Sequence, residues 1–263
     1  MFSDFPDATF LHHLADVADA ETLHRFRSVL TIDTKVKPGW KFDPVTAADR
    51  EAELALRRAI SDRYPDHGIL GEEFGVKQSE SPIQWVLDPV DGTRPFICGI
   101  PVWGTLIGMT VEGRARLGLM SQPFTRERFW GDDTGAWRQG TDGRHRLSAS
   151  KVTDLSEAIL HLNSPESLTD GVRGGFQRLS AAAKMTRYGG ECYAFAMLAA
   201  GLIDVCIEPS LQPYDIVAII PIVEGAGGVV TRFDGGAAEM GGPIILAATP
   251  ELHAAALAIL LRS

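Results

Sequence analysis

Two aspartates, Asp88 and Asp91, stand three residues apart at the point where an apolar run meets a turn. Residues 85–87 predict a short buried strand that delivers Asp88 to its carboxyl end. Pro89 has no N–H to donate and a fixed φ, so we expect it to stop sheet pairing there. Two carboxylates on one rigid turn can face a cluster of cations, because hard divalent cations prefer oxygen ligands.

The residues after Asp91 predict an anion site beside these carboxylates. Gly92 and Thr93 follow the turn and the apolar pattern resumes at Phe96, so a helix is expected to begin at Asp91 or Gly92. The first N–H groups of a helix, beside a glycine that lets a ligand come close, can bind a phosphate. The alternative is an ordinary strand–turn–helix corner, because Asp-Pro and Asp-Gly are common turn dipeptides and Asp caps helices.

Further carboxylates stand at the ends of other predicted elements. Glu72 and Glu73 end a short apolar strand, where they are either part of a solvated loop or neighbours of Asp88. Asp215 stands in the first turn of an apolar helix predicted at residues 215–224, where it either joins the site or only favours the helix dipole. That these segments meet around one cation site is a hypothesis, because sequence spacing alone does not decide whether they are neighbours.

A polar stretch and a capped helix precede these motifs. Residues 34–44 contain lysines, proline and glycine, and they predict a mobile loop. The helix that follows, ending near residue 64, has Thr46 as its N-cap and Asp49 at the N3 position of a capping box. Capping is the default role of both residues, and a catalytic role needs independent support.

The remaining pattern predicts an α+β chain in two halves. Residues 105–111, 115–120, 127–130 and 135–138 predict an antiparallel meander, and the Gly-rich stretch 139–146 predicts a loop between halves 1–142 and 143–263. The second half alternates strands and helices, as an α/β layer does. The other expected helices are 8–30, 171–179, 191–200 and 250–261, and the other expected strands are 68–71, 158–162, 202–208, 229–232 and 243–247.

The composition is that of a globular protein with an acidic balance. A formal charge of −9 argues against a nucleic-acid or anionic-membrane partner. No apolar run is long enough to span a bilayer, and the N-terminus lacks the basic and apolar regions of a signal peptide. The cysteines, Cys98, Cys192 and Cys206, show no CxxC spacing and predict buried reduced thiols in a cytoplasmic protein.

Taken together, these motifs resemble the inositol monophosphatase superfamily over nearly the whole chain. The motifs are Gly71-Glu72-Glu73, the run Trp85-Val86-Leu87-Asp88-Pro89-Val90-Asp91-Gly92-Thr93, Tyr214-Asp215, and Glu224-Gly225-Ala226-Gly227-Gly228. Within the superfamily the chain looks most like the bacterial histidinol-phosphate phosphatases, on Phe42-Asp43-Pro44-Val45-Thr46, Gly92-Thr93-Arg94, Trp103-Gly104-Thr105-Leu106-Ile107, Gly189-Gly190-Glu191-Cys192-Tyr193 and Pro213-Tyr214-Asp215-Ile216.

The resemblance implies a layered α-β-α-β-α sandwich and Mg²⁺-dependent hydrolysis of a small phosphate monoester. By this likeness Glu72, Asp88 and the carbonyl of Val90 hold one Mg²⁺. Asp88, Asp91 and Asp215 hold a second, and Glu72 also reaches a third. Carboxylate and carbonyl oxygens suit Mg²⁺, whereas a zinc site would be expected to contain Cys or His.

The same likeness implies the catalytic and phosphate-binding groups. Gly92 and Thr93 offer N–H groups to the phosphate, and Thr93 with Asp49 orients the attacking water. Glu72 completes the catalytic set. Two cations can stabilise the attacking and the leaving oxygen of an in-line displacement, while the protein supplies positioning and donors.

The substrate side depends on residues further along the chain. Glu191 and Glu208 are expected to line the pocket mouth, where a carboxylate pair suits the ammonium of histidinol phosphate better than a neutral polyol. Glu191 is the more telling of the two, with helix capping as its alternative role. Arg94 binds either phosphate or a partner carboxylate, and Lys35 or Lys41 corresponds to a mobile-loop lysine of the family.

Three functions therefore stay open from the sequence. The first is a histidinol-phosphate phosphatase, and the second is an inositol-1-monophosphatase or a broader hydrolase of sugar, polyol or nucleotide phosphates. The third is a catalytically silent scaffold, against which the intact carboxylate set argues. A homodimer is expected from the family and from the apolar region around Phe96 and Trp103.

Overall fold

A computed structural model describes residues 5–35, 42 and 44–262 of the chain. Its helices are α1 (Ala8–Thr22), α2 (Ala47–Arg63), α3 (Thr93–Ile97), α4 (Asp170–Ala182), α5 (Glu191–Ala199), α6 (Pro213–Ile216), α7 (Ile219–Gly225) and α8 (Pro250–Leu260), with 3₁₀ turns η1 (Leu155–Glu157) and η2 (Pro165–Ser167). Residues 36–41 and 43 of the predicted loop, Lys41 among them, lie outside the described residues.

The strands form two large sheets and a small ribbon. The strands are β1 (Ile32–Thr34), β2 (Pro44–Thr46), β3 (Gly68–Gly71), β4 (Gly75–Lys77), β5 (Ile83–Asp91), β6 (Gly104–Val111), β7 (Arg114–Gln122), β8 (Glu127–Asp132), β9 (Gly135–Gly140), β10 (Gly143–Arg146), β11 (Ile159–Leu162), β12 (Met185–Tyr188), β13 (Val205–Leu211), β14 (Val229–Arg232) and β15 (Gly242–Ala247). β1 pairs with β2, and the sheet orders are β10-β9-β8-β7-β6-β5-β3-β4 and β12-β11-β13-β15-β14.

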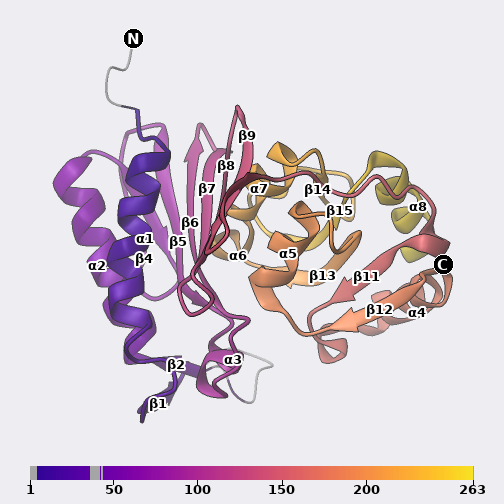
Figure 1. Cartoon of the computed structure of the whole chain (residues 1–263), viewed down its shortest axis with the longest axis horizontal. Coiled ribbons are helices and arrows are strands. Elements are labelled where there is room, and N and C mark those ends of the chain that lie inside the picture. Colours follow the sequence, from indigo (N-terminus) through magenta and orange to yellow (C-terminus); the bar gives the residue numbers. More distant parts are fainter. Residues whose placement is uncertain (1–4, 36–41, 43, 263) are drawn as a thin grey trace.

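The elements stack in the predicted α-β-α-β-α order (Figure 1). Helices α1 and α2 cover one face of the eight-stranded sheet, and α5 and α7 lie between the two sheets. Helices α4 and α8 cover the far face of the five-stranded sheet. The layered fold class is therefore confirmed.

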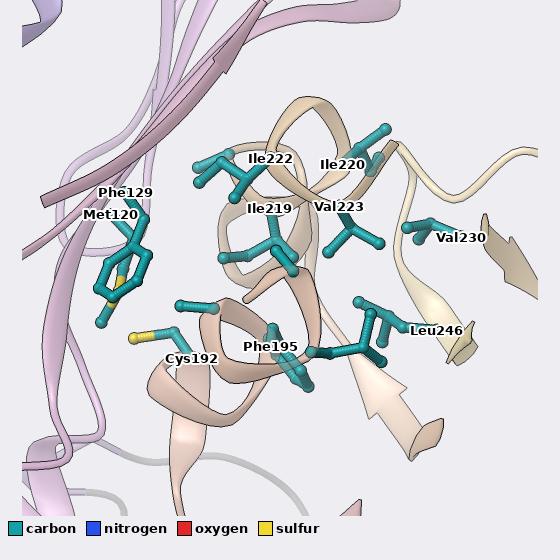
Figure 2. Close-up of a cluster of buried hydrophobic side chains, with 14 of the residues drawn as sticks. Met120, Phe129, Cys192, Phe195, Ile219, Ile220, Ile222, Val223, Val230 and Leu246 are labelled. Atoms are coloured by element: carbon teal, nitrogen blue, oxygen red, sulfur yellow. The ribbon is translucent and has the colours of Figure 1, made fainter. Parts of the chain in front are cut away.

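Buried side chains fill the space between the two sheets (Figure 2). Met120 and Phe129 extend from the eight-stranded sheet toward Cys192 and Phe195 of α5, and the isoleucines of α7 lie beside them. Burying a large apolar side chain contributes about 1.5–3 kcal/mol, so this layer fixes how the two sheets meet. That meeting matters because residues from both predicted halves reach one pocket.

Two predicted helices differ from the structure. The first ends at Thr22 rather than residue 30, because the chain turns through a left-handed Arg27 with φ of 62° and places Phe26 against Phe96 and Trp103. The helix predicted at 215–224 is divided into α6 and α7. Pro221 has no N–H to donate to the carbonyl one turn earlier, which accounts for the break.

Several strands were missed or misplaced. The predicted loop at 139–146 is wrong, because these residues belong to the hairpin of β9 and β10 that ends the eight-stranded sheet. The sheet thus continues past the predicted boundary at residue 142, and the division into halves stays a prediction. β1, β2, β4 and β12 are too short for a clear alternating pattern, and β13 begins at Val205 rather than residue 202.

Pro89 does not stop sheet pairing, which corrects the prediction for the Asp88 turn. β5 continues to Asp91, which pairs with Gly104, and the register against β6 shifts between Asp88 and Asp91. β3 pairs with β5 only as far as Leu87, so Pro89 has a strand neighbour on one side only. A missing N–H is tolerated at such an edge and at a β-bulge.

Two predictions about surface residues are also wrong. Phe96 and Trp103 are buried inside this chain, with Phe26 and Val90 around them, so they are not an exposed dimer patch. Cys192 and Cys206 are buried as predicted, but Cys98 is exposed. None of the helices in the described part of the chain has the length and apolar character that crossing a membrane requires.

Gly118 on β7 lets the central helical layer touch the sheet backbone. A Cβ at this position would overlap the carbonyl of Ala218, between α6 and α7. We therefore expect Gly118→Ala to reduce the free energy of unfolding by about 2 kcal/mol or more, the usual cost of overpacking. Thermal unfolding measures the change. Gly171→Ala is the control, because a Cβ there meets nothing within 4 Å and alanine favours the helix. Equal effects of the two substitutions would contradict this packing account.

Candidate active site

Parallel pairing of β3 with β5 brings Glu72 beside Asp88. Gly71 is opposite Leu87, and the N–H of Glu72 donates to the carbonyl of Leu87 at 3.1 Å. The residues that follow this pair, Glu72 and Asp88, therefore lie side by side. The predicted proximity of Glu72 and Asp88 is confirmed.

The bulge in β5 and the start of α6 complete an acidic cluster. The N–H of Val90 donates to Oδ1 of Asp88 at 3.1 Å, which fixes the turn between Asp88 and Asp91. Carboxylate oxygens of Asp88, Asp91 and Asp215 all lie within 4.8 Å of one another. Asp215 also accepts from the N–H of Gln212 at 2.6 Å, so it caps α6 and faces the cluster at once.

The aspartates of this cluster are electrostatically unfavourable by themselves. Burial raises the pKa of Asp88 well above its ordinary value, and the charges of Glu72 and Asp91 raise it further. Burial also raises the pKa of Asp91 to about 6, against a hydrogen bond from Cys192 at 2.7 Å. Buried carboxylates that repel one another fit a bound divalent cation, whose charge would offset both effects.

The donor chemistry fits Mg²⁺. The cluster supplies carboxylate oxygens, and the carbonyl oxygen of Val90 lies nearby, 3.2 Å from the hydroxyl oxygen of Thr93. Mg²⁺ binds through a few carboxylates and keeps several waters, which a cluster of this kind permits. The assignment of each residue to a particular ion stays a prediction.

Asp49 and Thr93 meet beside the cluster. The hydroxyl of Thr93 lies 3.1 Å from Oδ1 of Asp49, and Oδ2 of Asp49 accepts from the N–H and hydroxyl of Thr46 at 2.9 and 2.7 Å. The predicted capping box is confirmed. One carboxylate oxygen thus caps α2 while the other faces Thr93, so capping and a role in the site are compatible.

Gly92 lies close to Glu191, a residue far from it in the sequence. It caps α3 in a left-handed conformation, with φ of 84°, so the predicted helix start is confirmed. A Cβ on Gly92 would lie 2.8 Å from Cγ of Glu191. Glycine is therefore required for its backbone conformation and for the approach of Glu191.

Lys35 lies at the same edge, beside the paired glutamates. Its ammonium is 2.9 Å from Oε1 of Glu72 and also contacts the carboxylate of Glu73. Burial raises the pKa of Glu73 to about 7, although the hydrogen bond from Lys35 acts against this rise. Lys35 is therefore the described lysine of the predicted loop that reaches the candidate metal ligands.

A pocket of about 370 Å³ opens over the cluster. It is lined by Pro44, Glu72, Asp88, Val90, Asp91, Gly92, Thr93, Arg94, Asn163, Ser164, Gly189, Glu191 and Asp215. Residues from both predicted halves thus meet in one cavity. Arg94 lines it from the exposed side and donates to the carbonyl of Phe42 at 3.1 Å.

Glu191 and Glu208 occupy different depths. Glu191 lines the pocket, whereas Glu208 is only 5% exposed and accepts from the backbone N–H of Asn163, so its predicted place at the mouth stays a prediction. Burial raises the pKa of Glu191 to about 7 and that of Glu208 to about 8. Asn163 was missed from the sequence because an Asn-Ser pair after a strand is typical of any turn.

The raised pKa values predict how the metal-free protein responds to pH. The pKa values of Asp91, Glu191 and Glu208, at about 6, 7 and 8, exceed those of ordinary carboxyls. Between pH 5 and 8 the folded state therefore binds more protons than the unfolded state, so the free energy of unfolding falls as the pH rises. We expect the melting temperature after chelation to drop by roughly 5 °C or more over this interval.

Thermal unfolding in EDTA across this pH range tests the expectation. Glu208→Gln removes one of the titrating groups and should flatten the dependence. Added Mg²⁺ should flatten it as well, because a cation favours the charged carboxylates. A melting temperature that rises from pH 5 to 8 in EDTA would contradict the raised pKa values of these carboxyls.

The fold and the acidic pocket define a metal-dependent phosphatase of the inositol monophosphatase type. Residues 6–263 match the inositol monophosphatase family, and the chain belongs to it. A solved inositol monophosphatase from Zymomonas mobilis superimposes with a TM-score of 0.85 at 34% identity, over 96% of each chain.

Two relatives have more specific names. The histidinol-phosphatase of Streptomyces coelicolor is 38% identical over 87% of this chain and 87% of its own length. The chloroplastic bifunctional phosphatase IMPL2 of Arabidopsis thaliana is 41% identical over 73% of this chain, and the match spans only 55% of that relative's length. These similarities support a phosphoric monoester hydrolase.

Proposed function

We propose that the chain is an Mg²⁺-dependent histidinol-phosphate phosphatase, which converts L-histidinol phosphate and water to L-histidinol and phosphate. One observation carries the proposal: the carboxylate of Glu191 lines the same pocket as the aspartate cluster. A phosphate ester held at the cluster would thus present its other end to an acidic wall. The relative named histidinol-phosphatase supports this substrate.

In this proposal Glu72, Asp88, Asp91, Asp215 and the carbonyl of Val90 hold two or three Mg²⁺ ions. Bound Mg²⁺ lowers the pKa of a coordinated water and neutralises charge on the reacting oxygens. The carboxylates also fix the positions of the Mg²⁺ charges before the substrate binds. This preorganisation is the larger part of what the protein contributes.

The chain's own residues orient the water and the phosphate. Asp49 accepts from Thr93 at 3.1 Å, and the Thr93 hydroxyl can in turn receive a hydrogen bond from the attacking water. Holding the water in line with the ester bond is an orientation effect. Gly92 and Thr93 offer N–H groups to the phosphate, and Arg94 on the exposed wall favours its negative charge.

The charge of the pocket favours an amino alcohol phosphate over a polyol phosphate. An ammonium placed near Glu191 would gain a charge-assisted hydrogen bond, whereas a neutral hydroxyl would gain a weaker one. An ammonium would also favour the charged form of Glu191, whose pKa burial raises to about 7. Inositol 1-phosphate is the second candidate substrate, because the similar Zymomonas mobilis structure is an inositol monophosphatase.

A comparison of kcat/KM at saturating Mg²⁺ tests the proposal. The esters are L-histidinol phosphate, inositol 1-phosphate and adenosine 3′,5′-bisphosphate. We expect L-histidinol phosphate to be favoured over each of the others by at least about tenfold, the worth of roughly 1.4 kcal/mol in the transition state. Equal values for the first two esters would overturn the substrate and leave the metal site standing.

A catalytically silent scaffold, a homodimer and a cytoplasmic location need separate tests. The scaffold would release no phosphate from any of the three esters. The homodimer and the cytoplasmic location stay predictions.

A further inference from the structure

Asn163 stands at the end of β11 and connects the acidic wall of the pocket to its surroundings. Its side-chain Nδ2 donates to Oε2 of Glu191, and its Oδ1 accepts from the N–H of Glu191 at 3.3 Å. Its backbone N–H donates to Oε1 of Glu208 at 2.8 Å, and its carbonyl accepts from the N–H of Gly189 at 2.9 Å. Both polar ends of the side chain thus contact one residue, Glu191.

The two side-chain contacts fix the orientation of the amide. If the amide were flipped, its oxygen would face the carboxylate of Glu191 and its NH₂ would face an N–H. Both contacts would then be repulsive. Asn163 therefore has one favourable orientation, which the ionised form of Glu191 reinforces.

Glu191 needs this support because its backbone is strained. It has a φ of 47°, in the left-handed region that a residue with a side chain rarely adopts. Such a conformation is energetically unfavourable and persists only where the surroundings hold it. Gly189 and Gly190 precede it with φ of 73° and 159°, so the turn into α5 brings Glu191 over Gly92.

Glu208 anchors Asn163 from the interior. It is nearly buried, and its contact with the pocket side runs through the backbone of Asn163. A series of hydrogen bonds thus runs from Glu208 in the sheet, through Asn163, to Glu191 at the pocket wall. Of the three, Asn163 is the member that touches both carboxylates.

We propose that Asn163 is a positioning residue for substrate selectivity, which holds Glu191 in its strained conformation so that the carboxylate meets the ammonium group of an amino alcohol phosphate. This inference rests on the proposed function, because the ammonium group belongs to the proposed substrate. It assigns the selectivity to a residue whose side-chain hydrogen bonds go to Glu191.

The test compares kcat/KM for L-histidinol phosphate with that for its deamino analogue, in the wild type and in Asn163→Ala. The ratio of the two values measures recognition of the ammonium. We expect Asn163→Ala to lower the ratio at least about tenfold, through a higher KM for the amino ester, while kcat for the deamino analogue stays within about threefold. Retained hydrolysis of the deamino analogue shows that the variant is folded. Ser167→Ala, on the adjoining 3₁₀ turn, is the control and should keep the wild-type ratio.

The outcomes separate this inference from the proposed function. A wild-type ratio well above one that survives Asn163→Ala overturns the role of Asn163 alone. A wild-type ratio near one overturns the ammonium site itself, and with it both this inference and the proposed substrate. An equal loss of kcat for both esters would assign Asn163 a general structural role and also overturn the inference.

The chain offers a second measurement, because Asn163 is the only asparagine in the sequence. Protein labelled with ¹⁵N-asparagine therefore gives a single side-chain NH₂ pair in the NMR spectrum. We expect L-histidinol to shift this pair and the deamino alcohol to leave it nearly unchanged. A pair that neither compound moves would contradict the inference even if the kinetics agreed.

Discussion

Asp88→Asn is expected to lower kcat/KM at least about a thousandfold at saturating Mg²⁺. Asp88 lies in the aspartate cluster, and the charges of Glu72, Asp91 and Asp215 all act on it. Asparagine keeps the shape of the side chain but loses the negative charge that two cations would share. Metal stabilisation of the transition state is worth several kcal/mol, and each 1.4 kcal/mol is about tenfold in rate.

Thermal unfolding shows whether the lower kcat/KM of Asp88→Asn reflects a lost metal site or a misfolded protein. In EDTA the Asp88→Asn variant should unfold at a higher temperature than the wild type, because it removes one buried charge from a repulsive cluster. Asp133 is an exposed aspartate outside the cluster, so Asp133→Asn should change neither kcat/KM nor the melting temperature in EDTA. Hydrolysis by Asp88→Asn at the wild-type rate would mean that the cluster does not hold the catalytic metal.

Thr93→Val is expected to reduce kcat about a hundredfold with little change in KM. Valine keeps the size of the side chain and removes the hydroxyl that lies 3.1 Å from Asp49. Loss of one positioned proton-transfer or water-orienting group typically costs about a hundredfold or more. Steady-state kinetics on L-histidinol phosphate measures both constants.

Asp49→Asn provides the matched comparison for Thr93→Val. If the two side chains act as a unit, the double variant should lose little more than either single variant. Asp49→Asn should also lower the melting temperature, because Asp49 caps α2 through Thr46, whereas Thr93→Val should not. Fully additive losses in kcat would show that Asp49 and Thr93 act separately.

The acidic cluster could be predicted because its residues stand where apolar runs of the sequence give way to polar turns, or where a helix begins. Glu72 and Asp88 each follow an apolar run in the sequence, and parallel pairing of β3 with β5 places them together. Asp49 could be predicted as a cap, and only the resemblance connected it with Thr93. The contact between Gly92 and Glu191 crosses the two halves, which no local pattern shows.

The failures have physical causes in tertiary packing. Residues 139–146 carry the glycines of a loop, yet they form part of a hairpin, because β8 offers a sheet edge to β9 and β9 in turn offers one to β10. Phe96 and Trp103 have the composition of an interface, yet Phe26 covers them within the same chain. Asn163 has no sequence signal, since its importance lies in contacts with residues 28 and 45 positions away.

The most direct test of the central claim is the initial rate of phosphate release from L-histidinol phosphate as free Mg²⁺ is raised after chelation. We expect no release above background in EDTA and a saturable rise with Mg²⁺, because the carboxylates of Asp88, Asp91 and Asp215 need a cation to work together. A full rate in EDTA would contradict the metal site and the mechanism built on it.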